Sequence, residues 1–210
     1  MSARAPAPLQ TADTMTPAQL ARRERVVDAV IGMVAAGRVD DLAMKDVAER
    51  SGVALGTIYR YFSSKDHLAA AALRAWAAAL DEPARRTPLP EGTMADRLVA
   101  ILTRAVRAYQ RQPSFGRLLI LAANSTDPFA SECYREMGEA VYAALGTALD
   151  GLDAGEQRRV LDVVGAVWYH ALVEWVNDRK TIAQVYTAVE DAARLVLAGF
   201  EPDRPEGGPP

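Results

Sequence analysis

Apolar residues recur at every third or fourth position along most of this 210-residue chain, which is the spacing of one face of an α-helix. Runs of β-branched or aromatic residues at every second position, the pattern of a half-buried strand, are absent from the sequence. Hydrophobic residues make up 50% of the chain, which is enough at this length for a sizeable core. We therefore expect an all-α protein of one or two domains.

Two classes of protein are excluded by what the sequence lacks. No apolar run approaches the roughly 20 residues that a membrane-spanning helix needs, and no apolar N-terminal segment indicates secretion. Cys133 is the only cysteine, which excludes an intrachain disulfide and a cysteine-based zinc site. We therefore expect a cytoplasmic protein with no membrane partner.

Groups that commonly perform catalysis are scarce. The chain has two histidines and one cysteine, and it lacks a Gly-rich phosphate loop, a G-x-S-x-G motif and recognisable paired carboxylates. His170 and Glu174 are four residues apart on one helix face, but two such groups do not make a metal site. We therefore predict that the protein is not an enzyme and needs neither a cofactor nor a metal ion.

The net charge of −3 does not by itself favour a nucleic-acid partner, but the charge is unevenly distributed. Residues 1–80 hold ten Lys or Arg against eight Asp or Glu, a net charge of +2. Residues 81–210 hold fourteen against nineteen, a net charge of −5. This modest asymmetry fits a DNA-contacting N-terminal part followed by an acidic remainder.

The stretch from Met44 to Lys65 predicts two short helices, the second over about 54–61, around a tight turn at Gly52. This is the shape of a helix-turn-helix unit, in which one helix enters the major groove of B-DNA and its partner braces it. Hydroxyl, guanidinium and ammonium groups, which bind phosphates and base edges, gather near the end of the second helix in Thr57, Tyr59, Arg60, Tyr61 and Lys65.

Composition divides the chain into four parts. Residues 1–15, rich in Ala, Pro and Thr, are expected to be a disordered arm, and residues 201–210, rich in Pro and Gly, a disordered tail. Residues 16–63 are the expected DNA-binding domain. Residues 64–200 are the expected second helical domain, which opens with a connecting helix over 64–81.

Caps and hydrophobic periodicity predict the remaining helices. Three prolines and a glycine over 83–92 indicate a loop after the connecting helix. Capping residues and prolines then predict helices over about 94–112, from 113, over 128–150, over 155–178 and over 182–200.

The last two of these helices, 155–178 and 182–200, are strongly apolar. Their apolar faces could close the core of one subunit, or they could pair with a twofold copy in a four-helix interface. We favour a homodimer, because one short recognition helix reads too few base pairs for useful specificity. The expected DNA partner is therefore a palindromic double-stranded operator.

Four segments carry a family resemblance, namely LAMKDVA at 42–48, GV at 52–53, GTIYRYF at 56–62 and SKDHL at 64–68. Together they are similar to the DNA-binding domain of TetR-family transcriptional regulators, from the first helix into the fourth. The remaining helices, which bring the expected total to about nine, have the layout of such regulators. The resemblance implies a homodimeric repressor whose C-terminal domain binds a small ligand and then releases the operator.

The resemblance also implies roles for single residues. It implies contacts with bases or the DNA backbone for Lys45, Leu55, Gly56 and Thr57, and phosphate contacts for Tyr59, Tyr61 and Lys65. Arg60 is the residue that we expect to read bases directly. Ala43 departs from the Thr or Ser that is common in the family, so one hydroxyl contact and one helix cap are expected to be missing.

The ligand-binding residues are less specified than the DNA contacts. Candidates with aromatic, apolar or amide side chains are Phe115, Leu119, Asn124, Phe129, Met137, Trp168 and Trp175. Apolar residues at helical spacing also build ordinary cores, so this set is a hypothesis. The segment GAVWYHALVEW at 165–175 resembles the corresponding helix of KstR-type regulators of steroid catabolism, which implies a large apolar effector such as an acyl-CoA or a steroid thioester.

The leading hypothesis is therefore a DNA-binding repressor that a small molecule releases from its operator. The alternative is a constitutive DNA-binding regulator that has no ligand, and an enzyme is the least favoured reading. A ligand-sized cavity among residues 94–176 would favour the first hypothesis, and a filled core there would favour the second.

Overall fold

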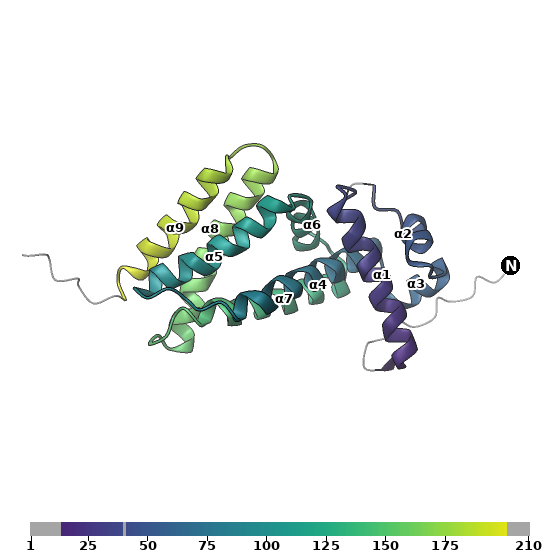
Figure 1. Ribbon diagram of the computed structural model, residues 1–210, viewed down its shortest axis with the longest axis horizontal. Coiled ribbons are helices and arrows are strands. Elements are labelled where there is room, and N and C mark those ends of the chain that lie inside the picture. Colours follow the sequence, from purple (N-terminus) through teal and green to yellow (C-terminus); the bar gives the residue numbers. More distant parts are fainter. Residues whose placement is uncertain (1–13, 40, 201–210) are drawn as a thin grey trace, which may run out of the picture. The chain divides into compact units, whose positions relative to one another are not determined.

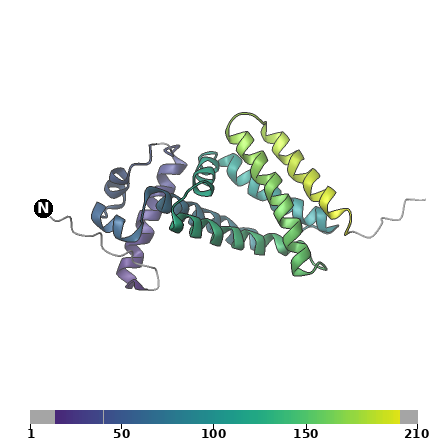
Figure 2. The same cartoon turned by 180° about the vertical axis from the view of Figure 1, so that it is seen from behind.

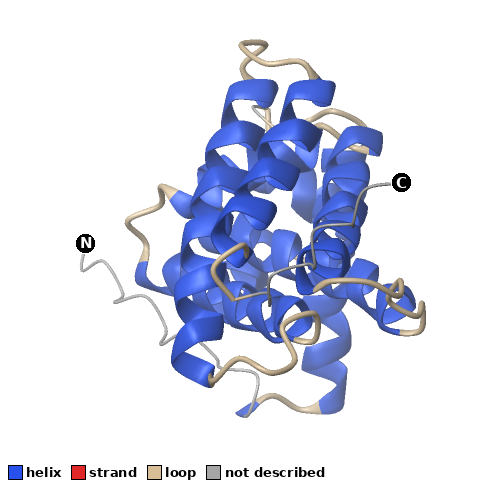
Figure 3. Ribbon diagram, turned by 90° about the vertical axis from the view of Figure 1, so that its left-hand side faces the viewer, coloured by secondary structure: helices blue, strands red, loops and turns tan. Residues whose placement is uncertain are grey.

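The computed structural model describes residues 14–39 and 41–200, and this described part of the chain consists of helices joined by loops and turns, without a strand (Figure 3). The expected all-α architecture is confirmed. Apart from Thr14 and Met15, the expected disordered arm and tail lie outside the described residues. None of the described helices combines the length and apolar character that crossing a membrane requires.

The described residues form nine helices (Figure 1). They are α1 (Pro17–Ala35), α2 (Met44–Ser51), α3 (Leu55–Tyr61), α4 (Lys65–Arg85), α5 (Met94–Arg111), α6 (Ser114–Ala123), α7 (Pro128–Gly146), α8 (Ala154–Val176) and α9 (Ile182–Leu197). Helix α4 runs past its expected end at residue 81 and through Pro83. Helix α7 ends before residue 150, because the N–H groups of Ala148 and Leu149 bond carbonyls three residues back and close a turn.

Side-chain caps explain why four of these helices begin where they do. In each, the side chain at the N-cap accepts from the backbone N–H three residues on, and that residue's side chain accepts from the N-cap N–H. The cap pairs are Thr16 with Gln19, Thr93 with Asp96, Asp153 with Glu156 and Thr181 with Gln184. All four pairs carry the capping-box pattern in the sequence.

The chain divides into two compact units. Unit 1 comprises residues 1–79 and 114–137, and unit 2 comprises residues 80–113 and 138–210. The domain boundary expected at residue 64 stays a prediction. The start of α4, all of α6 and the first half of α7 belong with the helix-turn-helix, and α6 packs directly against α1.

Unit 1 is organised around α1, which packs against α2, α3 and α6. Its core is built from fully buried side chains that include Met33, Val47, Ile58, Phe62 and Leu68. Trp76 of α4 stacks on Phe115 of α6, with ring centroids 4.3 Å apart. The helix-turn-helix is therefore one face of a larger cluster.

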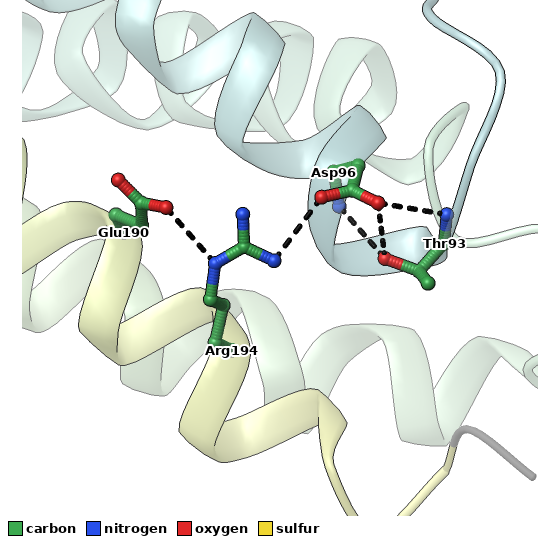
Figure 4. Close-up of polar contacts among 4 residues, drawn as sticks. All are labelled: Thr93, Asp96, Glu190 and Arg194. Atoms are coloured by element: carbon green, nitrogen blue, oxygen red, sulfur yellow. Dashed lines mark hydrogen bonds and ion pairs between the residues drawn. The ribbon is translucent and has the colours of Figure 1, made fainter. Parts of the chain in front are cut away.

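Unit 2 is held by α8, α9 and α5, with α9 packed against both of the others (Figure 2). A polar link at the surface ties two of these helices together, because Arg194 of α9 bonds Glu190 at 2.9 Å and Asp96 of α5 at 3.1 Å (Figure 4). The carboxylate of Asp96 also accepts from the N–H of Thr93 and so completes the capping box of α5. Those bonds from Thr93, followed by the bond from Arg194, lower the pKa of Asp96.

Candidate nucleic-acid interface

The turn between α2 and α3 has the backbone that a helix-turn-helix requires. Gly52 ends α2 in the left-handed conformation, with φ 65° and ψ 23°. Any side chain is strained there, because its Cβ approaches the following carbonyl. The hydroxyl of Ser51 accepts from the N–H of Val53 at 3.3 Å and supports the turn. The predicted turn is present at the predicted residue.

One side of α3 faces solvent. Leu55 and Tyr59 are 39% and 49% exposed, and Gly56 and Arg60 are also exposed. These four positions recur at the three- and four-residue spacing that shares a helix side. Lys45, in the first turn of α2, is exposed as well, whereas Thr57 and Lys65 are half-buried. The structure therefore leaves most of the predicted DNA-contacting side chains accessible.

Tyr61 is an exception. Its side chain is 2% exposed, and it lies one turn after Ile58, which is fully buried. Residues three apart share a helix side, so both point into the core of unit 1. Little of this side chain is exposed in the free protein, and the phosphate contact of Tyr61 stays a prediction.

The N-terminus of α2 carries no side-chain cap, as the alanine at position 43 predicted. The backbone N–H groups of its first turn therefore lack the bond that a Ser or Thr would accept, and such groups favour an anion. Asp46 lies in the same turn and would oppose a phosphate, but it forms an ion pair with Arg38. The local charge at this end of α2 is thereby partly neutralised.

A polar cluster adjoins the end of α3, and we call it the α4–α7 junction; its members are Ser63, Asp66, His67, Ser125 and Asp127. The hydroxyl of Ser63 donates to Oδ2 of Asp127 at 2.8 Å, and its N–H donates to Nδ1 of His67 at 3.1 Å. In the opposite sense, the hydroxyl of Ser125 donates to Oδ2 of Asp66 at 2.8 Å. Two hydroxyl–carboxylate bonds thus join the start of α4 to the loop before α7.

Rings extend the junction on both sides of His67. Phe62 meets the imidazole edge-on at 5.2 Å, and Phe129 of α7 stacks on it at 5.3 Å. The guanidinium of Arg23, from α1, lies 4.9 Å from the centroid of the Phe62 ring. These contacts between rings and the guanidinium connect α1, the end of α3, α4 and α7.

Comparison with known proteins adds independent information. Residues 39–72 match the family model for bacterial regulatory proteins of the tetR family, and residues 92–196 match the model for the tetracyclin repressor-like C-terminal domain. The chain is 32% identical over 199 residues to the HTH-type transcriptional repressor KstR of Rhodococcus jostii, which covers 92% of this chain and 91% of that protein. The chain belongs to the TetR family of bacterial regulatory proteins.

Solved structures of TetR-family proteins share the fold. A TetR transcriptional regulator from Rhodococcus sp. RHA1 superimposes with a TM-score of 0.73 at 24% identity, over 88% of this chain and all of that one. Thermus thermophilus FadR, solved in complex with lauroyl-CoA, gives 0.68 at 16% identity, over 89% of this chain and all of that one. The helix-turn-helix is therefore that of a DNA-binding transcriptional regulator of this family, and the predicted family resemblance is confirmed.

The candidate ligand residues fall into both units of this TetR-family chain. Five lie in unit 1, where Phe115, Leu119 and Met137 are buried, whereas Asn124 and Phe129 are exposed. Phe129 stacks on His67, which gives its ring a structural partner. Trp168 and Trp175 lie in unit 2. Among the described residues, the indole Nε1 of Trp168 is the buried side-chain donor without a hydrogen-bond partner.

Sequence reasoning did not find the α4–α7 junction. Ser64 caps α4 by accepting from the N–H of His67 at 3.0 Å, and no local pattern marks Ser63. Asp127 immediately precedes Pro128, the first residue of α7. The signal that they meet is absent from the local sequence, because the two residues are 64 positions apart.

Burial of His67 predicts a pH-dependent stability. Desolvation, followed by the nearby charges of Arg23 and Arg74, outweighs the attraction of Asp127 and lowers the pKa of His67 from 6.5 to about 4. Below pH 6.5 the imidazole of residue 67 is therefore protonated in the unfolded chain but stays neutral in the folded chain. The free energy of unfolding consequently falls as the pH falls towards 4. Between pH 7 and pH 5 this one group removes on the order of 2 kcal/mol from the free energy of unfolding.

The measurement is chemical denaturation at pH 7 and at pH 5. His67→Gln should lose about 2 kcal/mol less than the wild type between the two pH values. His170→Gln is the matched control, since His170 is the other histidine and is exposed. Equal losses in His67→Gln and the wild type would contradict the assignment.

Proposed function

We propose that this protein is a homodimeric transcriptional repressor that binds a palindromic operator in the cytoplasm and leaves it when a small apolar effector binds. The exposed side of α3 carries the proposal, because it offers side chains suited to a major groove on a TetR-family helix-turn-helix. The relative from Rhodococcus jostii is a repressor by name. The FadR of Thermus thermophilus was solved with an acyl-CoA.

Each exposed group has a distinct role in the proposed complex. Lys45 and Lys65 supply positive charge at the starts of α2 and α4, and they would bind phosphates. Tyr59 would donate its hydroxyl to a phosphate. Arg60 has the planar fork that binds a guanine edge, and it would read sequence. Leu55, Gly56 and Thr57 would let the start of α3 approach the bases closely.

Salt dependence tests these DNA contacts. If Lys45 and Lys65 each neutralise one phosphate per subunit, the log–log slope of affinity against salt should be about −4 in the dimer. Lys65→Ala should reduce the magnitude of the slope by about 2 in the dimer and weaken cognate and random DNA alike. Arg60→Ala should in addition lower the ratio of cognate to random affinity.

The measurement is fluorescence anisotropy with DNA selected from a random pool. Arg107→Ala, which removes an equal charge from an exposed position of α5, should leave both slope and specificity unchanged. A wild-type slope near zero would refute the phosphate contacts. An unchanged specificity ratio in Arg60→Ala would refute base reading.

The unpaired indole of Trp168 supports an effector site in unit 2. Its buried N–H has no acceptor among the described residues, which is unfavourable unless a bound group supplies one. The ring lies edge-on to Tyr109 at 5.7 Å and packs against the apolar core of unit 2, so its surroundings are otherwise apolar. An apolar molecule with a carbonyl oxygen, such as an acyl or steroid thioester, would satisfy both features.

Trp168→Phe should weaken binding of a matching thioester by about five- to tenfold, because one hydrogen bond is lost while a ring remains. Calorimetry with lauroyl-CoA and with a steroid CoA thioester would measure this loss. Trp175→Phe, the same change on the same helix, should cost less, because its indole nitrogen is not a buried unpaired donor. Equal affinity of wild type and Trp168→Phe for every thioester that binds would contradict the role of the indole.

Exposed apolar side chains on α8 and α9 support the proposed dimer through these two helices. Leu195 is 77% exposed and Val163 is 49% exposed, although the opposite sides of both helices are buried in unit 2. Large exposed apolar side chains commonly mark interfaces between chains. A second copy that packs through α8 and α9 would remove them from water.

Leu195→Glu should convert the dimer to a monomer, because a carboxylate would be buried without a partner. Analytical ultracentrifugation at micromolar concentration would show the change in mass. Leu80→Glu, at an apolar residue of α4 that is 38% exposed, should leave the dimer intact. A wild-type monomer, or a dimeric Leu195→Glu, would refute this interface.

A further inference from the structure

We propose that Asp127 is a positioning residue for operator binding, and that it acts through Ser63 to hold the turn that ends the recognition helix. Asp127 precedes α7 and is far from α3 in the sequence. The bond between its Oδ2 and the Ser63 hydroxyl spans 64 residues at 2.8 Å. Ser63 lies two residues after Tyr61, the last residue of α3, and two before Lys65, the first residue of α4.

The direction of the hydrogen bonds in the junction follows from their donors. The backbone N–H of Ser63 can only donate, so Nδ1 of His67 accepts and the ring is neutral with its proton on Nε2. The hydroxyl of Ser63 is then free to donate to Asp127. Ser63 is thus fixed twice, by its backbone to α4 and by its side chain to α7.

Asp127 is itself held in place and ionised. Its Oδ1 accepts from the N–H groups of Phe129 and Ala130, at 2.8 and 3.1 Å, and so caps α7. Burial opposes its ionisation, but bonds from Ser64, Ser63 and the backbone prevail, and the pKa of Asp127 is lowered. One carboxylate therefore anchors α7 with one oxygen and the end of the recognition helix with the other.

The orientation of α3 matters for DNA affinity, because this helix has only seven residues and must meet the groove at a defined angle. The turn at Ser63 is the exit of α3, so a loose turn gives the helix more orientations and lowers affinity through lost preorganisation. No group of the junction needs to touch DNA for this effect. The salt slope, which counts phosphate contacts, should therefore be unaffected.

A consequence for regulation rests on the proposed function. Helix α7 begins at the junction in unit 1, and residues 138–146 carry it into unit 2. A displacement of α7 caused by an effector would shift Asp127 and so weaken its hydrogen bond with Ser63. The junction variants should then bind operator weakly even without an effector, and they should respond less to it.

The test uses the full-length protein with Ser63→Ala and Asp127→Ser. Serine still caps a helix, so Asp127→Ser keeps the cap of α7 while its shorter side chain no longer reaches Ser63. We expect each variant to lose about five- to tenfold in affinity for DNA selected by the wild type, with an unchanged salt slope. Ser63→Ala should have no further effect in the Asp127→Ser background. Ser63→Thr, which keeps the hydroxyl, should retain the affinity of the wild type.

Two further controls separate positioning from general damage. Thr147→Ala removes an exposed hydroxyl that lies in unit 2 and bonds the carbonyl of Ala144, and it should leave affinity unchanged. Faster amide hydrogen exchange confined to the α3–α4 turn should accompany Ser63→Ala, and it is measurable without DNA. Unchanged affinity in both variants, additive losses in the double variant, or a shallower salt slope would overturn the proposal; a wild type that ignores every thioester would instead count against the effector.

Discussion

The recognition helix depends on burial, because a helix of seven residues is too short to be stable alone in water. Ile58 and Tyr61 place one side of α3 in the core of unit 1, and Phe62 fixes its exit. The other side is thereby left for solvent and for DNA. The same packing that makes α3 a helix therefore decides which of its side chains can touch a groove.

That core extends well beyond the helix-turn-helix. The start of α4, α6 and the first part of α7 complete the compact unit around α1. His67 lies where these elements meet, buried and neutral, between Phe62 and Phe129. Helices α4 and α7 both begin in unit 1 and continue into residues of unit 2.

Local patterns predicted much of this and failed where distant residues decide. Capping boxes placed the starts of α1, α5, α8 and α9, because the cap and its partner are three residues apart. The alanine at position 43 correctly predicted an uncapped α2. Tyr61 carries a hydroxyl that suggests a phosphate contact, and its spacing from Ile58 places the side chain on the buried side of α3. The prediction that α4 ends before Pro83 was wrong: the helix continues through that residue to Arg85.

The sequence by itself determined the helical class, the helix-turn-helix and its family, and the set of groups able to bind DNA. Those properties follow from spacings of three or four residues and from short motifs, and both are local features of the sequence. Only the tertiary structure decided that residues 114–137 join the DNA-binding unit, and that Asp127 meets Ser63. Such contacts join residues more than 60 positions apart, so they depend on how buried faces pack together and not on any local pattern.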